Sequence, residues 1–269
     1  MTRALDIWWD GRLVGQLTQN PHGELGFAYA PEWLGDAEVP PLSASLPKRV
    51  EPFSRRECRP FFGGLLPEEG QRGDRDIGDD GAVHRIHQED FCQALGVPPE
   101  IKYASEGGPT FKECFALLRR VAARPAVDVL KLLDAVIFNV IAGNADAHGK
   151  NFSILYDTGG PRLAPLYDLL ATVAYPDLSP NFAMKIGKRA TLAELDAKGW
   201  ASFAADTGLG LPLIRRRVAE ISRGVLEKAT TVAEELSPSG LDRRASEQFA
   251  DMIRDRAERC ALTVVGKGR

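Results

Sequence analysis

The sequence is poor in the residues that would indicate a metal cluster, a disulfide-bonded fold or a membrane span. It has only four cysteines and four histidines, and no two cysteines have CxxC spacing. Isolated cysteines argue against a structural zinc site and suit a reducing compartment. The longest apolar run, residues 135–143, is interrupted by Asn139 and is far too short to cross a bilayer. We therefore expect a cytoplasmic protein with no transmembrane segment.

The chain also lacks an excess of one charge and any internal repeat. Its formal net charge is −3, and its lysines and arginines are spread along the sequence. This distribution gives no drive towards direct contact with nucleic acid or with an anionic membrane. A length of 269 residues with 44% hydrophobic residues is enough for a sizeable core in one large or two smaller domains.

The first part of the chain has the alternating pattern of β-strands. Residues 3–29 predict strands, with a tight hairpin turn at Asp10-Gly11 and a last strand that stops at Pro31. Residues 31–60, rich in proline and charge, are interpreted as an ordered loop. A helix or turn is expected over 61–71, followed by a linker or β-turn at 71–85.

From Gln88 onwards the pattern becomes helical. Apolar residues at helical spacing predict helices over 110–123 and 126–143, and helices are predicted to end at Gly96 and Gly143. A capping-box pattern at Thr191 to Glu194 predicts a further helix start. Two strands are expected on either side of residues 158–160, and two long helices at 211–235 and 242–262. The predicted fold class is α+β, with a small β-containing domain at 1–70, a linker at 71–83 and a mostly helical domain at 84–265.

One stretch, GNADAHGKNFSIL at residues 143–155, is unusually dense in polar side chains after an apolar helix. Asp146 and Asn151 have D-x-x-x-x-N spacing, and Asp168 follows the predicted strand pair. This is the order of a kinase catalytic loop and its metal-binding aspartate. A carboxylate can orient a substrate hydroxyl, while an amide oxygen and a second carboxylate hold magnesium on nucleotide phosphates.

Structural interpretations of the same residues remain open at this point. Asparagine and aspartate frequently cap helices and form turns. His148 is compatible with a structural histidine held by hydrogen bonds. Lys150 is compatible with an ordinary lysine exposed to solvent. A metal-dependent phosphohydrolase using Asp146, His148 and Asp168 is a further alternative, although the sequence offers no additional metal ligands for it.

Several motifs in combination resemble the HipA family, the kinase toxins of bacterial toxin–antitoxin pairs. They are GNADAHGKNFSIL, LAPLYDLLAT, FAMKIGKR and HRIHQEDFCQALGVPPEIKY, preceded by WWDGRLVGQL and LSASLPKR with FFGGLLPE. The resemblance covers nearly the whole chain. It implies a HipA-like N-terminal domain, a protein-kinase-like helical C-lobe and an ATP- and magnesium-dependent serine/threonine kinase.

The resemblance also implies roles for individual residues. By matching positions, Asp146 is the catalytic aspartate, Asn151 and Asp168 bind Mg²⁺, and His148 and Lys150 line the catalytic loop. The partner implied is a HipB-like helix-turn-helix antitoxin, through which DNA is contacted only indirectly. The substrate implied is a cytoplasmic protein such as an aminoacyl-tRNA synthetase.

The chain departs from this family pattern in one respect. A HipA-type kinase has a nucleotide-binding lobe between the FFGGLLPE and HRIHQEDF motifs, which here are nearly adjacent. The sequence contains no G-x-G-x-x-G, no P-loop and no strand-borne lysine with a glutamate partner. The lobe therefore looks deleted, at a junction near Gln71 to Gly73, in the linker at 71–83. We expect impaired kinase activity, and a catalytically degenerate module that binds an antitoxin is the alternative.

Overall fold

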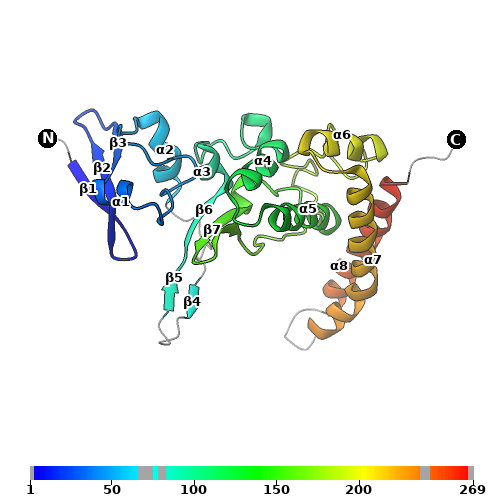
Figure 1. The fold of residues 1–269 in the computed structure, drawn as a ribbon. Helices are drawn as coiled ribbons and strands as arrows, with labels where there is room; N and C mark the ends of the chain where they lie inside the picture. The colour runs from blue at the N-terminus through cyan, green and yellow to red at the C-terminus, as the bar shows by residue number, and fades with distance from the viewer. Residues whose placement is uncertain (1–2, 66–74, 78–82, 237–242, 266–269) are drawn as a thin grey trace.

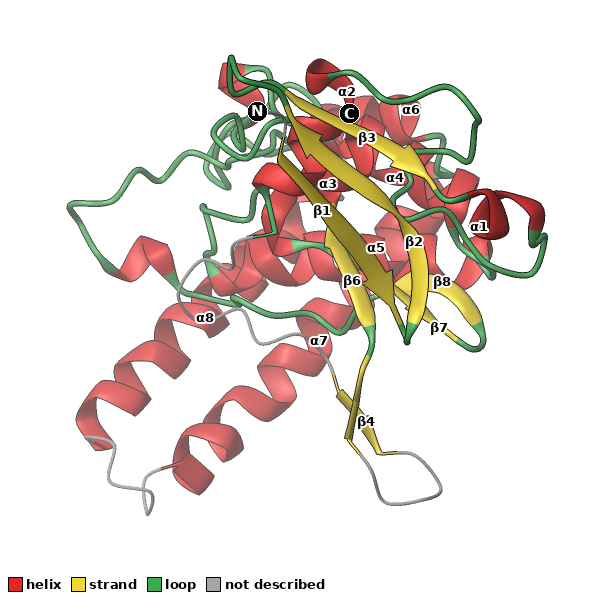
Figure 2. Ribbon diagram, turned by 90° about the vertical axis from the view of Figure 1, so that its left-hand side faces the viewer, coloured by secondary structure: helices red, strands yellow, loops and turns green. Residues whose placement is uncertain are grey.

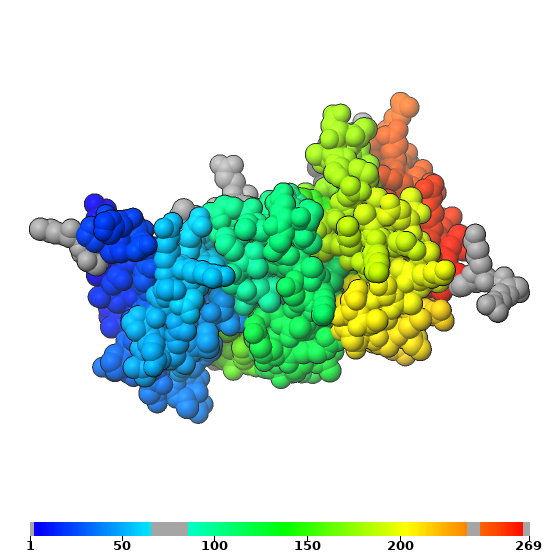
Figure 3. Space-filling view, turned by 90° about the horizontal axis from the view of Figure 1, so that it is seen from above, coloured from blue at the N-terminus to red at the C-terminus, as the bar shows by residue number. Residues whose placement is uncertain are grey.

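The structure is a computed structural model that describes residues 3–65, 75–77, 83–236 and 243–265. The molecule is elongated, with the N-terminal sheet at one end and the two longest helices at the other (Figures 1 and 3). Small antiparallel sheets and larger helices confirm the predicted α+β class. The strands are β1 (Arg3–Trp9), β2 (Arg12–Gln19), β3 (Leu25–Tyr29), β4 (Arg75–Ile77), β5 (Val83–Arg85), β6 (His87–Asp90), β7 (Ser153–Asp157) and β8 (Gly160–Leu163). The helices are α1 (Pro31–Gly35), α2 (Arg55–Gly63), α3 (Phe91–Leu95), α4 (Phe111–Val121), α5 (Pro125–Ala142), α6 (Ala197–Thr207), α7 (Leu211–Leu236) and α8 (Arg243–Thr263), with short 3-10 turns η1 (Ala104–Glu106), η2 (Gly149–Asn151) and η3 (Thr172–Ala174).

The N-terminal sheet has the order β1-β2-β3 and is antiparallel throughout (Figure 2). Asp10 and Gly11 both have positive φ, at 48° and 73°, and make the two-residue hairpin turn that the sequence predicted. Phe27 and Tyr29, two positions apart on β3, are buried on the same face of the sheet, because strand side chains alternate between faces. Its hydrophobic cluster comprises Val14, Phe27, Tyr29, Ala30, Trp33, Leu42, Leu46, Phe53, Cys58 and Phe61.

The prediction of a loop over residues 31–60 was wrong at both of its ends. Pro31 occupies the first turn of α1, where its missing N–H costs nothing. Ser54 and Glu57 form a capping box that starts α2. The Ser-x-x-Glu spacing by itself predicts a helix start, but the surrounding proline and charged residues favoured a loop.

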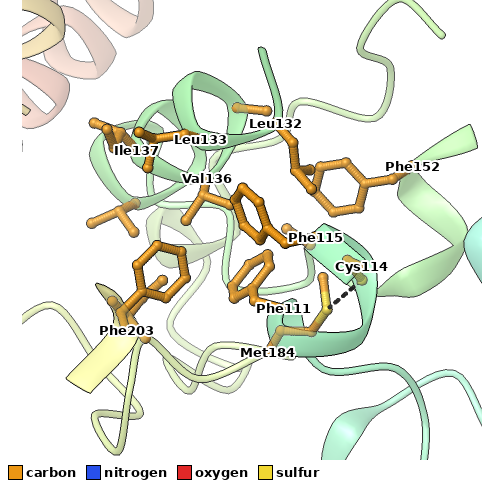
Figure 4. Close-up of a cluster of buried hydrophobic side chains, with 14 of the residues drawn as sticks. Phe111, Cys114, Phe115, Leu132, Leu133, Val136, Ile137, Phe152, Met184 and Phe203 are labelled. Atoms are coloured by element: carbon orange, nitrogen blue, oxygen red, sulfur yellow. Dashed lines mark hydrogen bonds between the residues drawn. The ribbon is translucent and has the colours of Figure 1, made fainter. Parts of the chain in front are cut away.

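The second hydrophobic cluster is centred on α4 and α5. Leu133, Val136 and Ile137 of α5 lie against Phe115 of α4 and Phe203 of α6 in a closely packed core (Figure 4). The predicted helices at 110–123 and 126–143 are confirmed, and α5 is buried around most of its circumference. This helix carries the polar stretch at its C-terminal end, so the stretch begins on a rigid support.

A three-stranded sheet of order β6-β7-β8 flanks this core. The hairpin of β7 and β8 was predicted, but β6 was not, because the sequence predicts a helical pattern from Gln88 onwards. Its residues pair with β7 more than sixty positions later, from His87 opposite Tyr156 to Asp90 opposite Ser153. Asp90 then caps α3, whose C-terminal Gly96 is left-handed as expected.

The remaining predicted elements differ from the structure in detail. Thr191 and Glu194 do form a local hydrogen bond, but the helix starts six residues later, at α6, with Asp196 as its N-cap. Helices α7 and α8 match the two long helices expected. The 71–83 linker includes β4 and the first residue of β5, which pair as a hairpin, whereas the junction near Gln71 to Gly73 lies outside the described residues. The proposed domain limits stay predictions.

No helix in the described ranges combines the length and apolarity needed to cross a membrane.

Candidate active site

The polar stretch begins where α5 ends and the chain turns at Gly143. Gly143 is left-handed, with φ of 80°, and a Cβ atom there would lie 2.2 Å from Val173 Cγ2. Glycine is required at this position both by the backbone conformation and by the lack of space. The amides of Gly143 and Asn144 both donate to the Asn139 carbonyl, which closes the helix.

The loop from Asn144 to Asn151 is held by hydrogen bonds of its own. The His148 amide donates to the Asp146 carbonyl at 2.8 Å and to Asn151 Oδ1 at 3.0 Å. The Asn151 amide donates back to the His148 carbonyl at 3.0 Å. The side chains of His148, Lys150 and Asn151 are buried, whereas Asp146 is partly exposed. Of the loop residues singled out from the sequence, Asp146 is therefore the one open to solvent.

Asn151 and Asp168 are in direct contact. Asn151 Nδ2 donates a hydrogen bond to Asp168 Oδ2, across seventeen positions of sequence. The hairpin of β7 and β8 causes this contact, because it returns the chain to the loop. Asp168 is exposed and has φ of 55°, a left-handed conformation that aspartate tolerates better than most residues. Of the three residues singled out from the sequence, Asn151 and Asp168 are thus in direct contact.

Tyr167 fixes the segment that leads into Asp168. Its hydroxyl donates to the Lys150 carbonyl at 2.5 Å and lies 2.7 Å from Ser153 Oγ. Since the tyrosine has one proton to donate, the serine hydroxyl is the donor in the second contact. Burial raises the pKa of Tyr167, so the hydroxyl stays protonated and keeps both contacts. Tyr167 precedes Asp168, unlike the phenylalanine of a kinase D-F-G motif, which follows the aspartate. Its hydroxyl therefore has a bonding role here.

Asp146 is connected to Asp168 through a third residue, Asn144. The Asp146 amide donates to Asn144 Oδ1 at 3.2 Å, and Asn144 Nδ2 donates to the Asp168 carbonyl at 2.9 Å. The His148 ring lies edge-on to Tyr103, with ring centroids 5.5 Å apart. The roles that the sequence suggested for Asp146, His148, Lys150, Asn151 and Asp168 stay predictions.

The donor chemistry of Asn151 and Asp168 fits a magnesium ion that is shared with phosphate. Mg²⁺ prefers oxygen ligands and is usually held by one or two carboxylates together with phosphate oxygens and water. The Asp168 carboxylate is exposed, and Asn151 Oδ1 accepts one hydrogen bond and retains a second lone pair. Within the described part of the chain, no three His, Cys, Asp or Glu residues are grouped to hold a metal alone. The phosphohydrolase using Asp146, His148 and Asp168 gains no support from this arrangement.

Sequence reasoning missed three residues that form hydrogen bonds with the backbone around the start of the loop. Thr172 Oγ1 accepts from the Ala145 amide at 2.8 Å and donates to the Gly143 carbonyl at 3.1 Å. Arg256 of α8 donates to the last carbonyls of α5, and Asn144 links the two aspartates. Asn144 lies inside the quoted motif and could have been considered. Thr172 and Arg256 are distant in sequence and carry no local signal.

Comparison with known proteins identifies the family. A model described as the HipA N-terminal domain matches residues 5–95, and one described as the HipA-like C-terminal domain matches residues 70–233. The chain belongs to the HipA family. The resemblance inferred from the sequence motifs is confirmed.

Relatives of this HipA-family chain carry names that describe them as kinases or putative kinases. It is 42% identical to the putative kinase Y4mE of Sinorhizobium fredii over 417 residues, covering 97% of this chain and 99% of the relative. It is 31% identical over 177 residues to the serine/threonine-protein kinase toxin HipA of Shewanella oneidensis, covering 61% of this chain and 40% of the toxin. A solved HipA from that organism, in complex with HipB and operator DNA, has the same fold, with a TM-score of 0.64 at 21% identity. The match covers 96% of this chain but only 63% of the solved chain.

The alignment with Y4mE shows that an internal part of that relative has no counterpart here. The alignment is 417 residues long and this chain has 269, so 417 minus 269 leaves at least 148 aligned positions without a residue of this chain. Because the alignment covers nearly all of both proteins, the extra residues are internal to Y4mE. This agrees with the missing lobe that the motif spacing indicated.

Proposed function

We propose that this chain carries the catalytic-loop half of a HipA-type serine/threonine-protein kinase toxin, and that its activity is impaired in isolation. The observation that carries the proposal is the contact between Asn151 and Asp168 beside the partly exposed Asp146. Those three groups are the set that phosphoryl transfer requires. The family assignment and the kinase names of the relatives agree with it.

Each group has a distinct proposed role. Asp146 orients the serine or threonine hydroxyl of a cytoplasmic protein substrate and accepts its proton as the γ-phosphoryl group transfers. Asn151 and Asp168 would hold magnesium against the phosphates of ATP, and the bound ion would supply positive charge that neutralises the phosphate oxygens. His148 and Lys150, both buried, keep the loop in place.

Impairment follows from what the chain lacks relative to Y4mE. Kinases hold ATP from two sides, and the glycine-rich loop and lysine of one side have no equivalent in this sequence. A nucleotide held from the magnesium side alone is poorly positioned for in-line transfer. A misplacement of about 1 Å can cost on the order of a hundredfold in rate.

A HipB-like helix-turn-helix antitoxin is the proposed partner. The support is the solved Shewanella oneidensis complex, in which HipA is found with HipB and operator DNA. Contact with DNA would then be indirect, in keeping with the net charge of −3. A catalytically degenerate module that retains this partner is the second candidate function, favoured by the at least 148 missing positions.

The deciding experiment compares this chain with a chimera. The internal residues of Y4mE that have no counterpart here are inserted between Gln71 and Asp74. Both proteins receive radiolabelled ATP, Mg²⁺ and an aminoacyl-tRNA synthetase as a candidate protein substrate. We expect little transfer by this chain, transfer by the chimera, and loss of that transfer in the chimera with Asp146→Asn.

Two other results would change the conclusion. Strong transfer by the unmodified chain that Asp146→Asn abolishes would show that residues outside the missing lobe hold the nucleotide. A folded chimera that binds ATP yet transfers nothing, while the chain still captures a HipB-like protein from the neighbouring genes, would favour the degenerate module.

A further inference from the structure

We propose that Asn144 is a positioning residue that keeps the two candidate catalytic aspartates in one fixed arrangement. The inference rests on the proposed function, because it assigns the aspartates to one reaction centre. Asn144 bonds the backbone of each of them. Its Oδ1 accepts from the Asp146 amide, and its Nδ2 donates to the Asp168 carbonyl.

The Asn144 side chain is itself anchored to the core. Its Nδ2 also donates to Asn139 Oδ1 at 3.0 Å, and Asn139 Nδ2 donates to the Ala135 carbonyl, one turn earlier on α5. Asn139 and Asn144 are 5% and 4% exposed, so water cannot readily replace these contacts. Both donor protons of Asn144 and its acceptor oxygen are used, which fixes the orientation of the amide. The backbone of both aspartates is thereby connected to the buried helix α5.

The contact with Asp168 matters because of the backbone conformation there. With φ of 55°, Asp168 is left-handed, and this conformation determines the direction in which its carboxylate points. Its carbonyl accepts hydrogen bonds from Asn144 Nδ2 and from the Leu170 amide at 3.1 Å. Removal of the Asn144 amide leaves the local Leu170 contact alone. The Asp168 carboxylate then loses its fixed position against Asn151.

The test uses full-length chains with two Asn144 variants and one control. Asn144→Ala removes all three side-chain hydrogen bonds, and Asn144→Asp keeps the size but faces a carboxylate oxygen towards carbonyl oxygens. Thr172→Val is the matched control. It removes two buried hydrogen bonds of the same loop, to Ala145 and Gly143, without removing any of the hydrogen bonds of Asp168.

Binding of Mn²⁺, used as a spectroscopic substitute for Mg²⁺, is measured by electron paramagnetic resonance, and urea unfolding measures stability. We expect all three variants to unfold at lower urea concentrations. Only the Asn144 variants should also weaken Mn²⁺ binding, by about tenfold or more, as is typical when a residue that orients a metal ligand is lost. Equal Mn²⁺ affinities in wild type, Asn144→Asp and Thr172→Val would overturn the inference.

A second readout needs no metal. Hydrogen exchange of the peptide covering residues 165–171 should be faster in the Asn144 variants than in Thr172→Val at matched global stability. If wild type binds no Mn²⁺, the proposed magnesium site is wrong, and this exchange measurement still decides the role of Asn144. Unchanged exchange over 165–171 would then refute that role.

Discussion

The carboxylate of Glu89 accepts a hydrogen bond at 2.5 Å from the hydroxyl of Ser43, which lies forty-six residues earlier. Glu89 belongs to β6, beside the candidate active site, and Ser43 belongs to the N-terminal part of the chain. The Ala44 amide and the Tyr156 hydroxyl donate to the same carboxylate. His87, also on β6, bonds the neighbouring Leu42 carbonyl at 2.8 Å. These contacts connect the two hydrophobic clusters of the molecule.

The contacts of Glu89 and His87 with the N-terminal part of the chain predict a distinctive pH dependence of stability. Burial raises the pKa of Glu89 to about 7, against the three hydrogen-bond donors, and burial lowers the pKa of His87 to about 4. Glu89 therefore contributes stability that is complete below about pH 4.5 and is lost as pH rises towards 7. His87 contributes stability that is complete above about pH 6.5 and is lost as pH falls towards 4. Each shift is worth roughly 3 kcal/mol.

The two contributions oppose each other between about pH 4.5 and 6.5. The free energy of unfolding of wild type, measured by urea titration, should change little across that window. Glu89→Gln removes one contribution, so its stability should rise with pH there. His87→Gln removes the other, so its stability should fall with pH. Parallel profiles for the two variants would show that neither group titrates as its burial implies.

A second prediction concerns Arg256, which supports the helix that leads into the candidate catalytic loop. Its guanidinium donates to the Val140 and Ile141 carbonyls at 2.7 and 3.1 Å, at the negative end of the α5 dipole. Arg256→Met keeps the apolar stem and removes both bonds. We expect a loss of about 1.5–3 kcal/mol in the free energy of unfolding.

Arg254→Met is the control for this experiment. Arg254 lies on the same helix and donates to the Leu226 carbonyl at 3.0 Å, away from the loop. Arg254→Met should lower the free energy of unfolding by less than Arg256→Met does. It should leave hydrogen exchange at residues 143–151 unchanged, whereas Arg256→Met should accelerate that exchange. Equal exchange at 143–151 in the two variants would count against support of the loop by Arg256.

Much of the fold and part of the candidate site could be predicted from the sequence. The features that could not be predicted have a physical reason in common. Periodicity identified α4, α5, α7 and α8, because each buries one face or, in α5, most of its circumference. The strand pair predicted between Asn151 and Asp168 is present, and it brings these two side chains into contact. Periodicity could not show β6, whose four polar residues are strand only because β7 pairs with them. Arg256 was invisible for the same reason, because its partners are more than a hundred positions away.

A third prediction concerns close packing under the loop. A Cβ atom on Gly149 would lie 2.7 Å from Pro109 Cγ and 3.0 Å from Cys92 Sγ, and both of those residues are buried. Gly149→Ala must therefore displace the loop, at a cost of about 1–3 kcal/mol in the free energy of unfolding. Weaker Mn²⁺ binding should accompany the loss, because Asn151 is two residues away.

The same substitution at Gly224 is the control. That glycine lies inside α7, and a Cβ there would meet no atom within 4 Å. Alanine is the better helix former by about 1 kcal/mol, so Gly224→Ala should raise stability and leave Mn²⁺ binding unchanged. If Gly149→Ala unfolds at the same urea concentration as wild type, Pro109 and Cys92 must be able to move away from the added methyl group without loss of stability.

The last prediction concerns three leucines beside the candidate site. Leu166, Leu169 and Leu170 flank Asp168 and are 38%, 42% and 51% exposed. Exposed apolar groups that gather in one place favour association with other surfaces. We expect this chain to self-associate with increasing concentration, as measured by light scattering coupled to gel filtration. Changing all three leucines to serine should reduce that association and cost less stability than the same change in the core, because these side chains are already partly exposed.

Three exposed leucines elsewhere, Leu5, Leu130 and Leu262, provide a matched control with the same number of substitutions. Their replacement by serine should leave the association unchanged if the surface around Asp168 drives it. The chimera that restores the internal residues of Y4mE gives an independent test. If those residues normally cover the leucines, the chimera should be monomeric without any leucine substitution. A chimera that associates as strongly as this chain would show that the missing lobe does not cover these leucines. The proposal that the nucleotide is held from the magnesium side alone would then need another explanation.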